Sequence, residues 1–137
     1  MTAEVLSAPL LNGRCLCGAV RYRVVDEFQY AMICHCTQCR RATGSAFKPF
    51  GGIARAKLEV LAGALRLYGD ALTHDAHCEI CGSLLYSVVS EGQRVHVTYG
   101  TLTDTPTLKP SQHIFVGSKA AWYEILDKLP QHDALPP

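Results

Sequence analysis

Residues 34–41 read CHCTQCRR, a segment that holds three cysteines within six positions, a histidine between the first two, and two arginines directly after the third. Free cysteine is often a small buried hydrophobe, but burial does not explain three thiols placed so close together. Thiolates at this spacing are typical of a metal site. The segment therefore predicts a metal centre, around which the flanking strands have to be arranged.

The chain has seven cysteines, and the four outside this segment also lie in short-spaced pairs. These pairs are Cys15 with Cys17 and Cys78 with Cys81. An odd number of thiols in local groups favours metal thiolates over disulfides. Structural zinc takes four protein ligands, whereas catalytic zinc keeps three and leaves one position exchangeable. Seven thiols divide into four and three, so we expect zinc as the cofactor, with two ions per protomer.

Two divisions of the seven thiols are compatible with their spacing. The first joins the CLC and CEIC segments in a closed structural site, where Gly82 permits a tight turn, and leaves an open tripod. Its closed site is Cys15, Cys17, Cys78 and Cys81, and its open catalytic site is Cys34, Cys36 and Cys39. The second is a zinc ribbon of Cys36, Cys39, Cys78 and Cys81, with Cys15, Cys17 and Cys34 left over. Spacing alone leaves both open.

Length and charge bound the class of protein. The chain has 137 residues, which fits one compact domain with its own core. Its net charge of +1 argues against a general polyanion binder, so we expect no nucleic-acid partner. No apolar stretch approaches the roughly 20 residues of a membrane span, and the start, MTAEVLSAPLL, does not resemble a signal peptide. We therefore expect a cytoplasmic protein without membrane contact.

Short alternating runs predict a mostly β protein. Residues 19–24, 58–60, 65–68 and 94–99 alternate apolar with polar side chains, and glycine and proline separate these runs. We expect a helical turn or two over Thr37–Ala42, whereas residues 120–126 are ambiguous. The expected architecture is a set of small twisted sheets whose loops are fixed by metal clips.

The expected domain limits follow from the two ends of the chain. Residues 1–11 form a loose N-terminal lead-in, residues 12–130 a single zinc domain, and residues 131–137 an irregular tail, because prolines bracket the segment PQHDALPP.

Four segments together resemble the glutathione-dependent formaldehyde-activating (GFA) family, which includes centromere protein V-like proteins. They are GRCLCGAVRY (13–22), CHCTQCRRATGSAF (34–47), CEICGSLL (78–85) and HIFVGSKAAWYEI (113–125), all in the family's order. The resemblance implies a tent-like, antiparallel, zinc-stabilised β fold. It also implies that the CxC and CxxC cysteines hold structural zinc and the CxCxxC cysteines catalytic zinc, which favours the first division. The implied activity is a carbon–sulfur lyase that forms S-hydroxymethylglutathione from glutathione and formaldehyde.

Three cations are candidate substrate contacts. Three thiolates on Zn²⁺ leave a negative charge, so Arg40, Arg41 and Lys48 are expected to offset it or to bind a glutathione carboxylate. His35 lies between two expected ligands and would point away from the metal in an extended segment.

Two functions remain open at this stage. The first is a thiol–aldehyde adduct enzyme with a small-molecule thiol and an aldehyde as partners, and the alternative is a non-catalytic, zinc-stabilised binding module. A homodimer is kept open in both cases.

Overall fold

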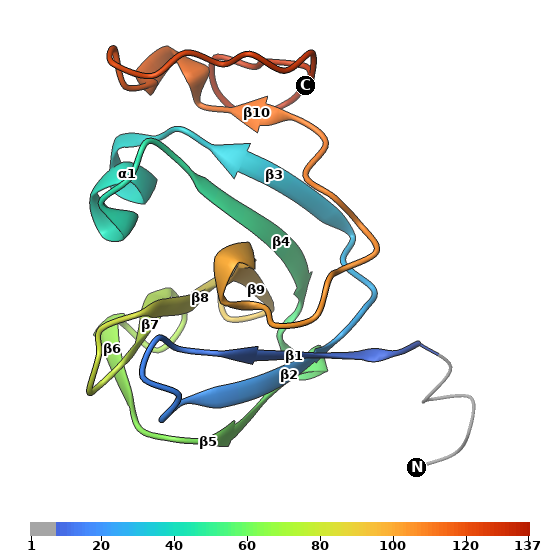
Figure 1. Cartoon of the computed structure of the whole chain (residues 1–137), viewed down its shortest axis with the longest axis vertical. Coiled ribbons are helices and arrows are strands. Elements are labelled where there is room, and N and C mark those ends of the chain that lie inside the picture. The colour runs from blue at the N-terminus through green and yellow to red at the C-terminus, as the bar shows by residue number, and fades with distance from the viewer. Residues whose placement is uncertain (1–7) are drawn as a thin grey trace.

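The computed structural model describes residues 8–137, which form two β-sheets (Figure 1). The smaller sheet has the strand order β1-β2-β5 and the larger one the order β10-β3-β4-β9-β8-β7-β6. All strand pairs are antiparallel except β10 with β3, which is parallel. The strands are β1 (Leu10–Arg14), β2 (Arg21–Val25), β3 (Tyr30–Cys34), β4 (Lys48–Ala54), β5 (Leu58–Ala62), β6 (Leu65–Gly69), β7 (His74–Cys78), β8 (Leu84–Val89), β9 (Arg94–Thr98) and β10 (His113–Ile114).

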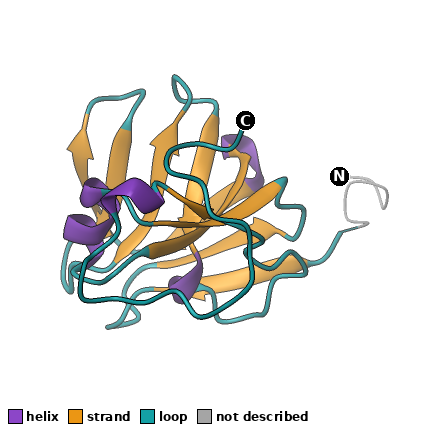
Figure 2. Ribbon diagram, turned by 90° about the horizontal axis from the view of Figure 1, so that it is seen from above, coloured by secondary structure: helices purple, strands orange, loops and turns teal. Residues whose placement is uncertain are grey.

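Helical structure is short and lies at the periphery of the strands (Figure 2). It comprises α1 (Thr37–Thr43) and three 3-10 turns, η1 (Arg55–Lys57), η2 (Tyr99–Thr101) and η3 (Val116–Ser118). None of the helices in the described range has the length and hydropathy needed to cross a membrane.

The main core lies between the two sheets. Successive side chains of a strand point to opposite faces, and in β2 this buries Tyr22 and Val24 while Arg21 and Arg23 stay exposed. β9 likewise buries Val95 and Val97. These side chains form one cluster that includes residues from both sheets. Burial of apolar surface at about 25 cal/mol per Å² therefore holds the sheets together.

The strand β4 is an inner strand of the large sheet and lies between β3 and β9. Glycines at 51 and 52 give it room for neighbouring aromatic rings, because a Cβ atom on Gly52 would lie 2.1 Å from Cζ of Tyr30. β4 begins at Lys48, which pairs with Cys34 at the end of β3. The pairing of β3 with β4 thus places a cation and a thiol side by side at one end of these strands.

The mostly β fold class is confirmed, and so are the strands expected within residues 58–60, 65–68 and 94–99. The run at 19–24 corresponds to β2, which begins at Arg21, and the helical turn corresponds to α1. No helix forms over residues 120–126.

The predicted C-terminal boundary of the N-terminal lead-in, residue 11, is wrong. Leu10 and Leu11 belong to β1, where Leu11 is buried in the core, so the folded domain begins before residue 12. Residues 1–7 of the predicted lead-in lie outside the described residues.

The C-terminal tail is irregular but is held in place. The backbone N–H of Phe115 donates to the carbonyl of Ala134 at 3.0 Å, and that of Val116 donates to the carbonyl of His132 at 3.0 Å. The N–H of His132 returns a bond of 3.0 Å to the carbonyl of His113. This segment lies beside β10, at the top of Figure 1.

Candidate metal centres and the adjoining cavity

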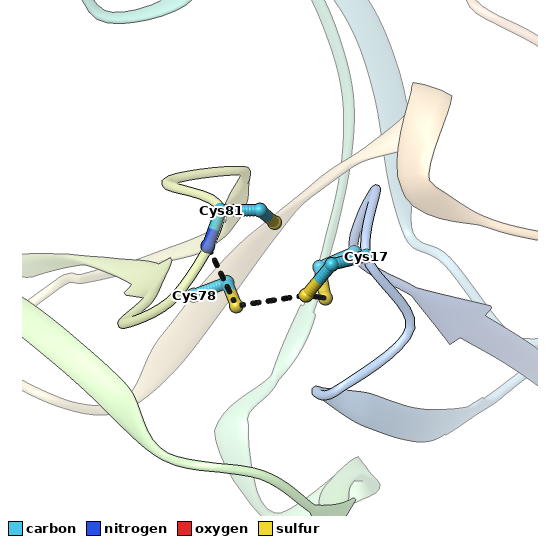
Figure 3. Close-up of side chains that lie close together, drawn as sticks. Cys17, Cys78 and Cys81 are labelled. Atoms are coloured by element: carbon cyan, nitrogen blue, oxygen red, sulfur yellow. Dashed lines mark hydrogen bonds between the residues drawn. The ribbon is translucent and has the colours of Figure 1, made fainter.

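Four sulfur atoms meet where the turn after β1 approaches the turn after β7. They belong to Cys15, Cys17, Cys78 and Cys81, and all lie within 4.8 Å of one another. The Cys17 sulfur is 3.6 Å from that of Cys15 and 3.8 Å from that of Cys78. In a tetrahedral site with Zn–S bonds of about 2.3 Å, neighbouring sulfurs are about 3.8 Å apart. The group, shown in part in Figure 3, therefore fits a closed four-thiolate metal site.

Both turns that carry these cysteines end in a glycine with positive φ. Gly18 has φ 82° and donates its N–H to the carbonyl of Cys15 at 3.2 Å, and Gly82 has φ 80° and donates to that of Cys78 at 2.9 Å. Glycine adopts this backbone region without steric cost. The glycine after each cysteine pair therefore allows the tight turn that directs the two thiols of that pair toward the other pair.

Ser83 connects the two turns, a role that the cysteine spacing did not indicate. Its hydroxyl accepts from the N–H of Leu16 at 3.0 Å and lies 3.3 Å from the sulfur of Cys81. The hydrogen bond from Ser83, with backbone N–H donors, lowers the pKa of Cys81 to about 5. Cys81 thus favours the thiolate that a metal ligand requires, whereas desolvation and hydrogen bonds with the neighbouring thiols raise the pKa of Cys17 to about 11.

The second group of sulfurs lies at the junction of β3, α1 and β4. Cys34 ends β3, Cys36 caps the N-terminus of α1, and Cys39 lies in the first turn of the helix. The sulfur of Cys36 accepts from the N–H of Cys39 at 3.3 Å. The three sulfurs lie within 4.8 Å of one another, and no fourth Cys, His, Asp or Glu ligand atom from residues 8–137 joins them. We call this group the tripod.

The thiols of the tripod perturb one another. Hydrogen bonding with Cys34 and burial raise the pKa of Cys39, while the charge of Lys48 opposes the rise. Hydrogen bonding with Cys39 lowers the pKa of Cys34. The two thiols therefore shift each other's pKa in opposite directions, and metal binding requires both as thiolates.

The grouping of sulfur atoms follows the first of the two expected divisions. The ribbon arrangement would require Cys36 and Cys39 to lie beside Cys78 and Cys81, and these residues fall into separate groups. Both groups could hold metal ions, and thiolate donors suit zinc. The identity of the metal stays a prediction.

His35 is fully buried and is not part of the tripod. Its Nε2 lies 2.8 Å from Nδ1 of His113, whose Nε2 is 3.0 Å from both carboxylate oxygens of Asp127. Burial, with the nearby charges of His113 and Lys119, lowers the pKa of His35 to about 4. The histidine is therefore a neutral buried group that connects the tripod segment to the C-terminal part of the chain.

Of the three predicted cations, Lys48 has the most buried position, with 6% of its surface exposed. Its ammonium group donates to the hydroxyl of Ser87 at 3.2 Å, and that hydroxyl donates to Oδ1 of Asp75 at 2.6 Å. Residues 8–137 contain no carboxylate within 4.0 Å of the Lys48 nitrogen. Buried ammonium groups are normally paired with a negative charge. Lys48 is an exception among the described residues, because it has no direct counterion.

The two arginines are placed differently. Arg40 donates from Nη1 to the carbonyl of Ser118 at 3.0 Å, and its buried Nε has no partner among the described residues. Arg41 lines a depression with Cys78 and Cys81, beside the four-thiolate group. The structure thus brings Lys48 to the tripod by strand pairing, fixes Arg40 to the C-terminal segment, and places Arg41 toward the other group.

A cavity of about 420 Å³ adjoins the tripod. Gln38, Cys39 and Ala42 line it from the α1 side, and Lys48 and His96 line it from the sheet. Asp75 and Ser87 also line it, from the neighbouring strands β7 and β8 of the same sheet. Sequence reasoning did not single out these last two residues, because β7 and β8 carry no motif that indicates a polar cavity.

The fold and the two cysteine groups define a mostly β protein with two candidate metal centres, one with four thiols and one with three. A family profile described as "Glutathione-dependent formaldehyde-activating enzyme" matches residues 10–118. This range covers both cysteine groups and most of the chain. The chain belongs to this family.

Individual relatives agree with this assignment. A protein of Halomonas elongata named "Putative glutathione-dependent formaldehyde-activating enzyme" is 29% identical over 127 residues, covering 85% of this chain and 81% of its own. A protein of Schizosaccharomyces pombe named as an uncharacterized lyase is 25% identical over 85 residues, which is 62% of each chain. The crystal structure of a Rhodobacter sphaeroides protein superposes with a TM-score of 0.56 at 27% identity, covering 70% of this chain and 91% of that protein.

Proposed function

We propose that the chain is a zinc-dependent carbon–sulfur lyase that interconverts a thiol and an aldehyde with their adduct. The default reaction is glutathione plus formaldehyde giving S-hydroxymethylglutathione, in keeping with the family's description. The observation that carries the proposal is the difference between the two sulfur groups. One has the four thiols of a closed site, whereas the other has three thiols, borders a cavity and has a buried cation beside it.

The reaction balances without a further reactant. The thiol loses its proton, its sulfur bonds to the carbonyl carbon, the π electron pair moves to the carbonyl oxygen, and that oxygen takes up a proton. A zinc ion held by Cys34, Cys36 and Cys39 would supply a Lewis acid that favours the thiolate form of a bound thiol. The cavity holds both reactants close together, which replaces a bimolecular encounter by an oriented one.

Lys48 supplies positive charge at this site. Three thiolates and a substrate sulfur concentrate negative charge, and an ammonium group shielded from water offsets it more strongly than an exposed one. Arg40 and Arg41 stay predicted substrate contacts, but we expect them to contribute less to substrate binding than Lys48. Arg40 is hydrogen-bonded to the carbonyl of Ser118, and Arg41 lies beside the four-thiolate group.

The alternative, a non-catalytic binding module, would need the tripod to be a second structural clip. Such a clip requires a fourth protein ligand, and residues 8–137 offer none at this position. We therefore prefer the enzyme. A cytoplasmic location, the absence of nucleic-acid partners and a homodimer stay predictions.

The test combines thiol binding with turnover. Titration calorimetry in two buffers of different ionisation enthalpy should show glutathione binding to the zinc-loaded chain with release of a proton, because a free thiol with a pKa near 8.5 is mostly protonated at neutral pH. Exchange spectroscopy with formaldehyde should then show faster adduct formation than in the absence of protein. Cys36→Ser should abolish both effects. If neither thiols nor carbonyl compounds bind to the loaded chain, catalysis is ruled out in favour of the binding module.

A further inference from the structure

The cavity beside the tripod carries two opposite charges that do not contact each other directly. The Lys48 ammonium and the Asp75 carboxylate both line it, and the hydroxyl of Ser87 lies between them, 3.2 Å from Lys48 Nζ and 2.6 Å from Asp75 Oδ1. Lys48 and Ser87 are each 6% exposed. All three side chains come from paired strands of the large sheet, which fix the positions of their backbones relative to one another.

Each charge has unused hydrogen-bonding capacity. An ammonium group has three donors, and the described residues accept one from Lys48. The second carboxylate oxygen of Asp75 accepts no hydrogen bond from the described residues. A cation and an anion held apart in one cavity are complementary to a ligand that carries both charges on neighbouring atoms. The single oxygen of formaldehyde can accept a hydrogen bond from Lys48, but formaldehyde has no donor for Asp75.

We propose that this cavity is a subsite for an α-amino acid group of the substrate thiol, with Lys48 binding its carboxylate and Asp75 its ammonium. The inference rests on the proposed thiol–aldehyde function and names the part of the thiol that the enzyme recognises. A volume of about 420 Å³ suits the γ-glutamyl end of glutathione. Cys39 lines the same cavity, and the γ-peptide link separates this end from the cysteine sulfur by a flexible chain.

A competing role for Lys48 is to offset the charge of the thiolates alone. That role would favour every thiol equally, whereas a subsite for an amino acid favours thiols that carry one. The two roles are therefore separable by varying the ligand, even without changing the protein.

The experiment measures the affinity of four thiols for the zinc-loaded full-length chain by calorimetry. They are glutathione, its glutaryl analogue without the α-amino group, its γ-aminobutyryl analogue without the α-carboxylate, and cysteinylglycine. Hydrogen bonds to charged groups correspond to about tenfold to a hundredfold in affinity. We expect each of the three truncated thiols to bind the wild-type chain more weakly than glutathione by a factor in this range.

The variants assign the two charges. Lys48→Met should lower the affinity for glutathione by about tenfold to a hundredfold more than the affinity for the γ-aminobutyryl analogue, whose binding can lose only the offset of thiolate charge. Asp75→Asn keeps an acceptor for the hydroxyl of Ser87. It should lower the affinity for glutathione and leave the affinity for the glutaryl analogue unchanged. Lys57→Met, at an exposed lysine paired with Glu27, is the matched control and should bind all four thiols as the wild type does. Zinc content and circular dichroism of each variant confirm folding.

The outcomes separate the two proposals. If all four thiols bind the wild type equally, or if Lys48→Met weakens cysteinylglycine as much as glutathione, the subsite is refuted and the lyase proposal stands. If no thiol binds, the subsite is refuted, and if carbonyl compounds also fail to bind, the lyase proposal is refuted as well. The ligand series on the wild-type chain decides the question even if a variant fails to fold.

Discussion

Nε2 of His35 lies 2.8 Å from Nδ1 of His113, so the middle of the CHC segment is bonded to a strand near the C-terminus. The carboxylate of Asp127 accepts from Nε2–H of His113, and the other ring nitrogen of His113, Nδ1, faces Nε2 of His35. The ring of His35 is fixed in this way, and with it the backbone between Cys34 and Cys36. Two thiols of the tripod therefore owe their orientation to residues about eighty positions away.

Removing the end of this chain of contacts should loosen the tripod. We expect Asp127→Ala to raise the rate of metal release from the tripod by about tenfold, the lower end of the effect of groups that orient metal ligands. The four-thiolate group should be unaffected. Chelator competition measures both rates, and Asp133→Ala, at an exposed aspartate of the same segment, is the control. Identical release from both variants would show that the contact does not support the tripod.

The two metal sites should differ in their resistance to chelation. The chain loaded with zinc under anaerobic conditions should hold two ions per protomer, one retained by the closed four-thiolate group and one released from the open tripod. Mild chelation followed by metal analysis tests this. A single bound metal, or two ions lost at the same rate, would contradict the division.

Serine substitutions should separate structure from activity. Cys78→Ser should greatly reduce the free energy of unfolding, because a structural metal contributes its binding energy to folding. Cys36→Ser should leave a folded chain with an impaired tripod. Urea unfolding monitored by circular dichroism compares the two. Equal loss of stability would mean that the tripod is also a structural clip.

Acid should destabilise the protein through His96. Burial, with the charges of Lys48 and Arg94, lowers the pKa of His96 to about 4, against about 6.5 in the unfolded chain. The folded state keeps the neutral form, so this contribution to stability is present above about pH 6.5 and is lost as the pH falls toward 4. We expect about 1 to 2 kcal/mol of loss by about pH 5, after allowance for the partial exposure of the ring.

The matched variant for this effect is His96→Gln, which can still pair with the hydroxyl of Tyr30, now 2.7 Å from Nε2. Its free energy of unfolding should fall less than that of the wild type between neutral pH and about pH 5. Excess zinc in both samples keeps the contribution of the thiolates equal. Parallel curves for the two proteins would exclude His96 as the group responsible.

A methyl group on Gly52 should destabilise an inner strand of the large sheet. A Cβ atom there would lie 2.1 Å from Cζ of the Tyr30 ring, so either the ring or β4 has to shift. We expect Gly52→Ala to cost about 1–3 kcal/mol, as overpacking of a core does. Gly100→Ala is the control, since nothing lies within 4 Å of its Cβ position. Thermal unfolding of the two variants should differ clearly in midpoint, and equal midpoints would refute the packing argument.

Alternation along the sequence predicted strands that have one buried face. β2 and β9 carry polar residues between buried ones, so their period was visible. It failed for β8, in which five successive residues are buried, and for β7, whose residues HDAHC are mostly polar. β10 has two residues and forms only because β3 provides a parallel partner. Such strands are determined by their neighbours in the sheet.

The candidate site also contains parts that the sequence indicated and parts that it did not. The short cysteine clusters limited the sulfur groups to two divisions, and only the family resemblance favoured the one that the structure contains. The contact between His35 and His113 was not, and neither was the hydroxyl of Ser87 between Lys48 and Asp75. These contacts join residues that are remote in the sequence and carry no motif of their own. Only the arrangement of the strands brings them together.

The two sulfur groups differ in how far their thiols are separated along the unfolded chain. The tripod is contained in residues 34–39, so a denatured chain can already bring its three thiols to one ion at little entropic cost. The four-thiolate group joins Cys17 to Cys78, 61 positions apart, and exists only once the sheets have met. A metal that also binds the denatured chain stabilises the native state less. During synthesis the tripod segment can therefore capture an ion first, whereas loading of the four-thiolate group marks completion of the fold.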